Sequence, residues 1–175
     1  NAGIAGPTAP VEEIALADWQ RCVSVNLEGA FLAAKYATPI MKTALSGSIV
    51  LTSSTAGQYG YPFRAPYAAA KWAVIGLMKT LAMELGPYGI RANAICPGAV
   101  EGERMEGVLA REALAKGMTR DAVYQGYASG TSMRSFVTAE DVANMAVFLG
   151  SDKARLVSGQ VIAVDGHTEN PDPKV

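Results

Sequence analysis

Apolar positions along the chain fall into segments of two kinds. Short runs rich in β-branched and apolar residues predict three buried strands, at 48–52, 90–96 and 161–164. Longer apolar stretches of helix-forming sequence predict helices, at about 18–43, 66–84 and 138–149. Strands that alternate with helices form a parallel sheet with helices on its faces, so the pattern predicts an α/β fold.

Several residues mark where the predicted helices begin. We expect Asp18 to cap the first helix, and Pro66 occupies a first-turn position, where proline is tolerated. Thr138 followed by Asp141 is the pattern of a capping box. Within the first helix, Asn26 is a functional candidate, because a polar side chain there costs stability unless a hydrogen bond or a kink uses it.

Composition and charge narrow the class of protein. Half of the 175 residues are hydrophobic, which fits one globular domain, and 15 Lys and Arg nearly balance 16 Asp and Glu. A chain with no basic stripe is not expected to bind nucleic acid, and its mild acidity argues against binding to an anionic membrane surface. The partner is therefore expected to be a small molecule. No run reaches the ~18 apolar residues of a membrane span, so we expect a cytoplasmic protein.

The cysteines and the histidine give no indication of a metal site. Cys22 lies in a predicted helix and Cys96 in a predicted strand, and both are interpreted as small buried apolar residues. His167 is the sole histidine, which excludes a multi-histidine metal site and argues against a Ser/His/acid triad. We assign no metal and no chemistry to these three residues.

Tyr67 and Lys71 are the strongest candidates for chemistry. Four residues apart on one helix they share a face, so the ammonium can favour the ionised form of the phenol. A free phenol titrates near ~10, and acid–base work around neutrality needs a neighbouring cation that lowers this value. For an isolated Tyr-x-x-x-Lys the alternative is a surface pair, so the surrounding residues decide between the two readings.

Ser54 adds a hydroxyl near this pair. It follows the predicted strand 48–52, where the apolar run gives way to a loop. Ligands of open α/β sheets bind at the carboxyl ends of the strands, so we expect Ser54 to face Tyr67 across the mouth of the sheet. The alternative for Ser54 is a hydroxyl that only satisfies the loop backbone.

With Asn26, Ser54, Tyr67 and Lys71 in this order, the chain closely resembles the short-chain dehydrogenase/reductase family. Three further segments carry the resemblance, namely Asn1-Ala-Gly3, Ile90-Arg-Ala-Asn-Ala-Ile-Cys-Pro-Gly98 and Ser158-Gly-Gln-Val-Ile-Ala-Val-Asp-Gly166. It implies a partial Rossmann-like, doubly wound parallel sheet with helices on both faces, as a single catalytic domain over 1–175.

The resemblance implies an NAD(P)-dependent oxidoreductase that interconverts a secondary alcohol and a carbonyl compound. Tyr67 would exchange a proton with the substrate oxygen, which Ser54 would orient. Lys71 would favour the tyrosinate and bind the nicotinamide ribose, and Asn26 would hold a water that links Lys71 to solvent. The residues implied to contact NAD or NADP are Asn1, Gly3, Tyr67, Lys71, Pro97, Gly98 and Val100. For Asn26 a structural role, and for Gly3 and Gly98 a role in permitting the turn, stay open.

The first part of the family's fold has no counterpart in this sequence. The glycine-rich turn that binds the pyrophosphate, and the acidic residue that selects the ribose, are missing. We therefore expect a fragment that binds dinucleotide poorly and is inactive in isolation. The strand at 48–52 would have an exposed edge, so we also expect poor solubility.

Residues 101–137 resemble the family's variable substrate lid. Gly102 stands where the family often has a Thr that bonds the nicotinamide carboxamide, so Glu101 or backbone amides would have to replace it. Arg104 is either a ligand for a carboxylate or phosphate or part of a solvated helix. Aromatic and Met side chains expected around the substrate are Tyr59, Tyr61, Phe63, Met105, Tyr124 and Tyr127.

Other function classes stay open beside the oxidoreductase. A non-catalytic fragment or oligomerisation subunit would keep the broad apolar surface of the helix at 66–84, through which the resemblance implies a homodimer or homotetramer. An extended-branch epimerase or dehydratase shares Tyr-x-x-x-Lys, but Pro97-Gly98 and the short C-terminal region disfavour it. The sequence does not distinguish NAD from NADP, and substrates considered are cyclic or medium-sized alcohols and a 3-oxoacyl thioester.

Overall fold

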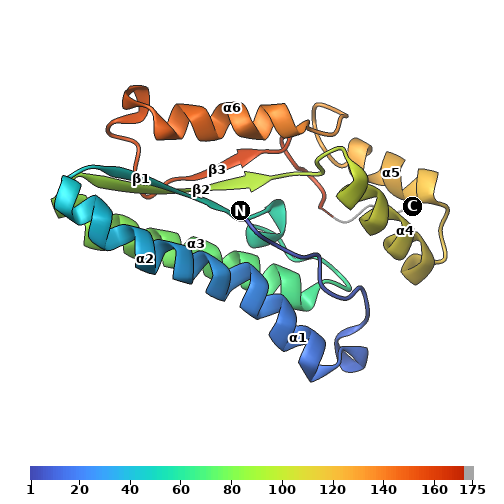
Figure 1. Cartoon of the computed structure of the whole chain (residues 1–175). Coiled ribbons are helices and arrows are strands. Elements are labelled where there is room, and N and C mark those ends of the chain that lie inside the picture. The colour runs from blue at the N-terminus through green and yellow to red at the C-terminus, as the bar shows by residue number, and fades with distance from the viewer. Residues whose placement is uncertain (172–175) are drawn as a thin grey trace.

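Three parallel strands form the sheet at the centre of the fold (Figure 1). The computed structural model describes residues 1–171. Strand β1 (Gly47–Thr52) pairs with β2 (Ile90–Pro97), and β2 pairs with β3 (Val161–Val164), so the order is β1-β2-β3. The three strands lie where the sequence predicts them, which confirms the α/β class. Within residues 1–171, β1 is an edge strand of this sheet.

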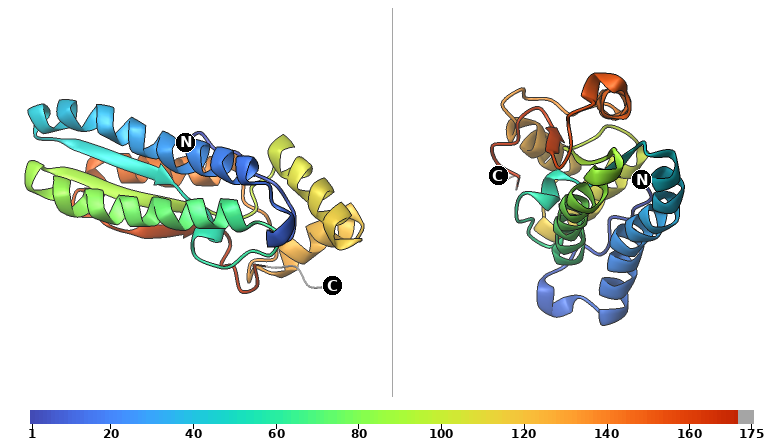
Figure 2. Two further views of the ribbon diagram at one scale, coloured as in Figure 1. Left: turned by 90° about the horizontal axis from the view of Figure 1, so that it is seen from below. Right: turned by 90° about the vertical axis from the view of Figure 1, so that its left-hand side faces the viewer.

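Helices cover both faces of the sheet (Figure 1). Helices α2 (Gly29–Ala44) and α3 (Ala65–Leu85) lie on one face, and α6 (Ala139–Gly150) lies on the other. Figure 2 shows α2 and α3 side by side along the sheet. The resemblance to a doubly wound sheet with helices on both faces is confirmed for the part of the fold present here.

The alternation of side chains along β1 explains the two layers of core. Ile49 and Leu51 are buried against α3, together with Val74 and Met78 of that helix. Val50, between them in sequence, belongs to the cluster on the opposite face, under α6. A strand sends successive side chains to opposite faces, so one apolar run supplies both cores.

The first helix is continuous but changes its winding at Asn26. Helix α1 (Leu16–Val23) passes through a π-helical turn, Ser24–Glu28, into α2. The local disturbance that Asn26 predicts is therefore a π turn. Such turns widen the helix by one residue and occur frequently at functional sites.

Two of the three predicted helix starts are confirmed. Pro66 lies in the first turn of α3, and Thr138 forms a capping box with Asp141 at the start of α6. The prediction for Asp18 is wrong, because Ala15 occupies the N-cap of α1 and Asp18 lies in the first turn. An acidic side chain there still interacts favourably with the positive end of the helix dipole.

Helices α4 (Glu103–Lys116) and α5 (Arg120–Ser129) lie beyond the carboxyl end of β2 (Figure 2). They pack on each other around a small core of their own, made by Leu109, Ala113 and Val123. They occupy most of the segment 101–137 that we expected to form a lid. No helix among residues 1–171 is long and apolar enough to cross a membrane.

Candidate active site

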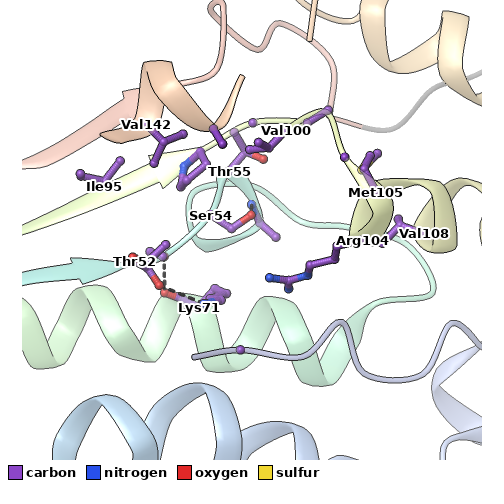
Figure 3. A pocket seen from close by; sticks show the side chains of 18 of the residues that line it. Thr52, Ser54, Thr55, Lys71, Ile95, Val100, Arg104, Met105, Val108 and Val142 are labelled. Carbon is purple, nitrogen blue, oxygen red and sulfur yellow. Dashed lines mark hydrogen bonds between the residues drawn. The ribbon is translucent and has the colours of Figure 1, made fainter. Parts of the chain in front are cut away.

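A cavity of about 740 Å³ lies at the carboxyl ends of β1 and β2 (Figure 3). Its walls come from the residues after β1, the start of α3, the loop after β2, the start of α4 and the N-terminal residues. Eight of the nine candidate residues line it, namely Asn1, Gly3, Ser54, Tyr67, Lys71, Pro97, Gly98 and Val100. Asn26 is the exception and lies behind Gly3, outside the lining.

Tyr67 and Lys71 share one face of α3, as their spacing predicts. The Lys71 ammonium nitrogen lies 5.6 Å from the centre of the Tyr67 ring. Lys71 is buried, with 4% of its surface exposed, and its Nζ donates a 2.9 Å hydrogen bond to the carbonyl oxygen of Thr52 at the end of β1 (Figure 3). The cation is thus held between the helix and the sheet, beside the phenol.

Burial changes the acidity of Lys71. Removal of the ammonium from water, together with the nearby positive charge of Arg104, lowers the pKa of Lys71 to about 8. A lysine with a pKa of about 8 releases and regains its proton near neutrality. Strongly shifted values of this kind gather at functional sites.

Two consecutive serines after β1 have different surroundings. Ser53 is buried and its Oγ donates a 2.8 Å hydrogen bond to the carbonyl oxygen of Lys71. Ser54 lines the cavity, as Ser53 does, but it is only half-buried, and its Oγ accepts a 3.2 Å hydrogen bond from the Ala56 amide. That bond corresponds to the structural alternative for Ser54, but it leaves the Ser54 hydroxyl proton free to be donated into the cavity.

Asn26 ties the π turn to the chain next to the cavity. Its Nδ2 donates hydrogen bonds to the carbonyl oxygens of Ile4, at 3.0 Å, and Cys22, at 2.9 Å. Its Oδ1 is buried and has no hydrogen-bond partner within residues 1–171. A Cβ atom at Gly3 would lie 2.8 Å from this oxygen and 3.7 Å from Lys71 Nζ. Both atoms therefore border Gly3, which must stay without a side chain.

Comparison with known proteins gives the family of this chain. A family model described as Enoyl-(Acyl carrier protein) reductase matches residues 1–167. The chain belongs to the short-chain dehydrogenase/reductase family. It is 40% identical over 166 residues to trans-4-hydroxycyclohexanecarboxylate dehydrogenase of Sinomonas cyclohexanicum, a match covering 95% of this chain and 57% of the relative.

Two further proteins are similar over almost the same range. D-beta-hydroxybutyrate dehydrogenase of Rhizobium meliloti (strain 1021) is 33% identical over 157 residues, which cover 89% of this chain and 61% of the relative. The crystal structure of an NAD+-bound xylitol dehydrogenase has a TM-score of 0.92 and 32% identity, covering 95% of this chain and 66% of that one. The chain thus spans about three fifths of the length of the two curated relatives.

A short-chain dehydrogenase/reductase holds a nicotinamide cofactor, and the residues around this cavity fit the nicotinamide side of one. Within residues 1–171, Lys71 Nζ uses one of its three N–H donors, so two remain for ribose hydroxyls. A Cβ at Gly98 would lie 2.8 Å from the Asp165 side chain and 2.9 Å from its Cα. This contact gives Gly98 a structural role in close packing, whereas its φ is not positive and the turn itself does not require a glycine there.

Gly102 departs from the family's Thr for a local reason. Its φ is +135°, a conformation that residues with side chains rarely adopt, and it forms the N-cap of α4. A Thr would be strained at this point of the backbone. Glu101 lines the cavity, but its amide already donates to the Val137 carbonyl oxygen at 2.9 Å.

Half of the expected substrate-side residues line the cavity. Tyr61, Met105 and Tyr127 do, whereas Tyr59, Phe63 and Tyr124 do not. The Tyr59 hydroxyl donates to the Thr168 carbonyl oxygen, and the Tyr124 ring stacks on Phe136 at 4.3 Å. Arg104 is exposed at the surface of α4 yet extends into the cavity (Figure 3), so it is more than part of a solvated helix face.

Sequence reasoning missed one charged residue of the site. Arg64 precedes α3, lines the cavity and is 7% exposed. Its guanidinium carbon lies 4.8 Å from the centre of the Tyr67 ring. The available signal was its position three residues before Tyr67, which places the two side chains on one face at the start of a helix.

The cysteines behave as expected from the sequence. Cys22 and Cys96 are both buried, and burial raises the pKa of each thiol. Among residues 1–171, no group of three or more His, Cys, Asp or Glu is arranged to hold a metal ion.

Proposed function

We propose that this chain carries the catalytic part of an NAD(P)-dependent oxidoreductase that interconverts a secondary alcohol and a carbonyl compound. The observation that carries the proposal is the Tyr67–Lys71 pair, which opens into the same cavity as Ser54. Relatives that are named dehydrogenases of hydroxylated compounds support the same reaction class.

Tyr67 is the proton-transfer group of the proposed reaction. Its hydroxyl gives a proton to the carbonyl oxygen in reduction and takes it from the alcohol in oxidation. Lys71, 5.6 Å from the ring centre, lowers the cost of the phenolate by its charge. When bound, the nicotinamide supplies or accepts the hydride at the substrate carbon.

Ser54 and Asn26 have supporting roles in this proposal. The Ser54 hydroxyl donates to the substrate oxygen and orients it, which stabilises charge that develops on that oxygen. Asn26 Oδ1 is an unpartnered acceptor beside Gly3, and a proton relay from Lys71 to solvent would pass through a water held there. The residues proposed to contact NAD or NADP are Lys71, Tyr67, Asn1, Gly3, Pro97, Gly98 and Val100.

The domain and assembly proposals follow from the same fold. We propose one partial Rossmann-like domain for the chain, whose residues 1–171 the structure describes, with α4 and α5 as the substrate lid over the cavity. Helix α3 leaves Trp72 and Met83 exposed, 52% and 82%, next to α2. Exposed apolar side chains on adjacent helices favour a homodimer or homotetramer through this surface.

The test is turnover by the full-length protein that contains this chain, with NAD and NADP and a panel of secondary alcohols. Tyr67→Phe keeps the ring and removes the hydroxyl, so turnover is expected to fall at least ~100-fold. Tyr88→Phe, in the turn after α3 and outside the cavity lining, is the matched control. Near-normal turnover of Tyr67→Phe contradicts the proposal, and conversion without net change in NADH would favour an epimerase.

A further inference from the structure

Arg64 is a buried cation at the wall of the cavity. It is 93% shielded from solvent, and it lies between the N-terminal loop and the first turn of α3. Its Nη2 donates a 3.3 Å hydrogen bond to the carbonyl oxygen of Ala5. The guanidinium also lies 4.8 Å from the centre of the Tyr67 ring, in the range of a cation–π contact.

These contacts leave most of the guanidinium unsatisfied. Arginine has five N–H donors, and within residues 1–171 only the bond to Ala5 uses one. Arg64 Nε is buried and has no acceptor. Nε is enclosed, whereas Nη1 forms no hydrogen bond within residues 1–171 and is not enclosed, so Nη1 is the free donor that a ligand in the cavity can reach.

The charge of Arg64 is also uncompensated. No ion pair joins Arg64 to a carboxylate of the described chain. The buried Glu112 accepts from the Tyr127 hydroxyl at 2.6 Å and pairs with Lys116 at 3.0 Å. The buried Asp165 accepts from the backbone amides of His167 and Thr168. Burying an unpaired charge is costly, so a counter-charge is expected to come from the open side, which is the cavity.

The cavity carries more positive charge than Arg64 alone. Arg104 extends into it from the start of α4 (Figure 3), and Lys71 lies at its floor. Two acids line it as well, Glu101 and Glu103, and both are exposed to solvent. The buried part of the wall near Tyr67 is therefore cationic.

We propose that Arg64 binds a carboxylate of the substrate, so that this enzyme acts on hydroxycarboxylates and oxocarboxylates. The inference rests on the proposed oxidoreductase function and narrows its substrate class. A guanidinium matches a carboxylate with two parallel N–H donors, and this geometry fixes orientation as well as supplying charge. Because Arg64 lies against the Tyr67 ring, the carboxylate sits within a few bonds of the carbon that reacts.

A purely structural role for Arg64 makes a different prediction. If Arg64 only clamps the loop at Ala5 and the Tyr67 ring, its loss should lower stability and weaken all ligands alike. Discrimination between a charged ligand and its neutral isostere separates the two roles.

The experiment is isothermal titration of the full-length protein, saturated with cofactor, with cyclohexanecarboxylate and with cyclohexanecarboxamide. The native protein is expected to bind the carboxylate at least about tenfold more tightly than the amide. Arg64→Gln should weaken carboxylate binding about 10- to 100-fold, the range for a hydrogen bond to a charged group, and should change amide binding less than about threefold. Arg111→Gln, which removes an exposed charge of α4, is the control and should change neither.

A second variant guards against loss of folding in Arg64→Gln. Arg64→Lys keeps the charge without the planar fork and should keep at least about a threefold preference for the carboxylate. Equal affinity of the native protein for the two probes, or a preference that survives Arg64→Gln, overturns the inference. Turnover of cyclohexanol and of the other alcohols is measured in parallel. If the native protein oxidises none of them, the proposed oxidoreductase function is contradicted; if it oxidises them without a preference for carboxylates, only the inference about Arg64 is overturned.

Discussion

Lys71 Nζ donates a 2.9 Å hydrogen bond to the main-chain carbonyl oxygen of Thr52. Thr52 is the last residue of β1, and Ser54 follows it by two residues. The position of the cation is therefore fixed by the sheet as well as by its own helix. One short segment thus places both the proposed oxygen-binding serine and the proposed charge beside Tyr67.

Stability is expected to depend on pH through Lys71. Burial lowers the Lys71 pKa from its ordinary 10.5 to about 8. Between pH 8 and 10.5 the unfolded chain holds a proton at Lys71 that the folded chain has released, so the free energy of unfolding rises with pH through this window. The full rise is at most about 3 kcal/mol, and urea unfolding of the native protein and of Lys71→Met at pH 7.5, 9 and 10.5 measures it.

The comparison with Lys71→Met removes the contributions of other titrating groups. The stability difference, native minus variant, should grow as the pH rises from 8 and should be flat below 8. Lys153→Met removes an exposed lysine and serves as the control. Parallel pH curves for the native protein and Lys71→Met would show that Lys71 keeps an ordinary pKa.

We expect Ser54→Ala to lower turnover and Ser53→Ala to lower stability. Ser54→Ala removes the hydroxyl that faces the cavity, so turnover is expected to fall about 10²- to 10³-fold with little change in stability. Ser53→Ala removes a buried donor to the Lys71 carbonyl oxygen, so the free energy of unfolding is expected to fall by about 1–3 kcal/mol. Steady-state kinetics and urea unfolding of both variants measure the two effects. Equal losses of turnover would contradict the proposal that Ser54 alone binds the substrate oxygen.

Asn26 and Asn93 form a second matched pair. Both amides are buried, at 2% and 0% exposure, and both donate to main-chain carbonyl oxygens. Changing either residue to Ala leaves those carbonyl oxygens without this donor and should lower the free energy of unfolding by about 1–3 kcal/mol.

Only Asn26→Ala should also reduce turnover, because Asn26 Oδ1, like Lys71 Nζ, lies beside Gly3 at the cavity. Turnover is compared at a temperature where both variants are folded by circular dichroism. If Asn93→Ala loses as much turnover as Asn26→Ala, the effect is one of general stability and the proposed relay role of Asn26 is wrong.

Gly57 should not tolerate a side chain. A Cβ there would lie 2.3 Å from Ser53 Oγ and 2.8 Å from the Lys71 carbonyl oxygen, so Gly57→Ala would push apart the two groups that form a hydrogen bond. We expect a loss of about 1–3 kcal/mol in the free energy of unfolding, as for overpacking of a core.

Gly107 is the control, because a Cβ there would meet only the far end of the Arg111 side chain. Gly107→Ala lies inside α4 and should raise the free energy of unfolding by up to about 1 kcal/mol, the difference in helix propensity. Thermal unfolding followed by circular dichroism shows whether each variant is less or more stable than the native protein. A stabilised Gly57→Ala would contradict the packing described around Ser53.

The sequence predicts best the features that one element determines alone. The strands follow from apolar runs, and the Tyr67–Lys71 pair follows from helical spacing, so both are found where expected. The Thr138 capping box is confirmed for the same reason, since all its atoms lie within four residues.

Features that depend on contacts between distant segments are not predictable in this way. Burial of Arg64 comes from its packing against the loop at Ala5, 59 positions away. Tyr59, Phe63 and Tyr124 are aromatic residues of the right regions, but the course of their loops and helices directs them away from the cavity. Composition alone could not separate them from Tyr61 and Tyr127.

The π turn at Ser24–Glu28 gives the long helix one residue more than a regular winding would hold. Each residue of an α-helix turns its neighbours by about 100°. The wide turn absorbs the rotation of its extra residue, so a deletion of one residue there should yield a regular, intrinsically more stable helix in which α1 and α2 keep nearly their present orientation. The shortened protein would gain helix regularity while losing the wide turn from which Asn26 donates to the Ile4 carbonyl oxygen beside the cavity.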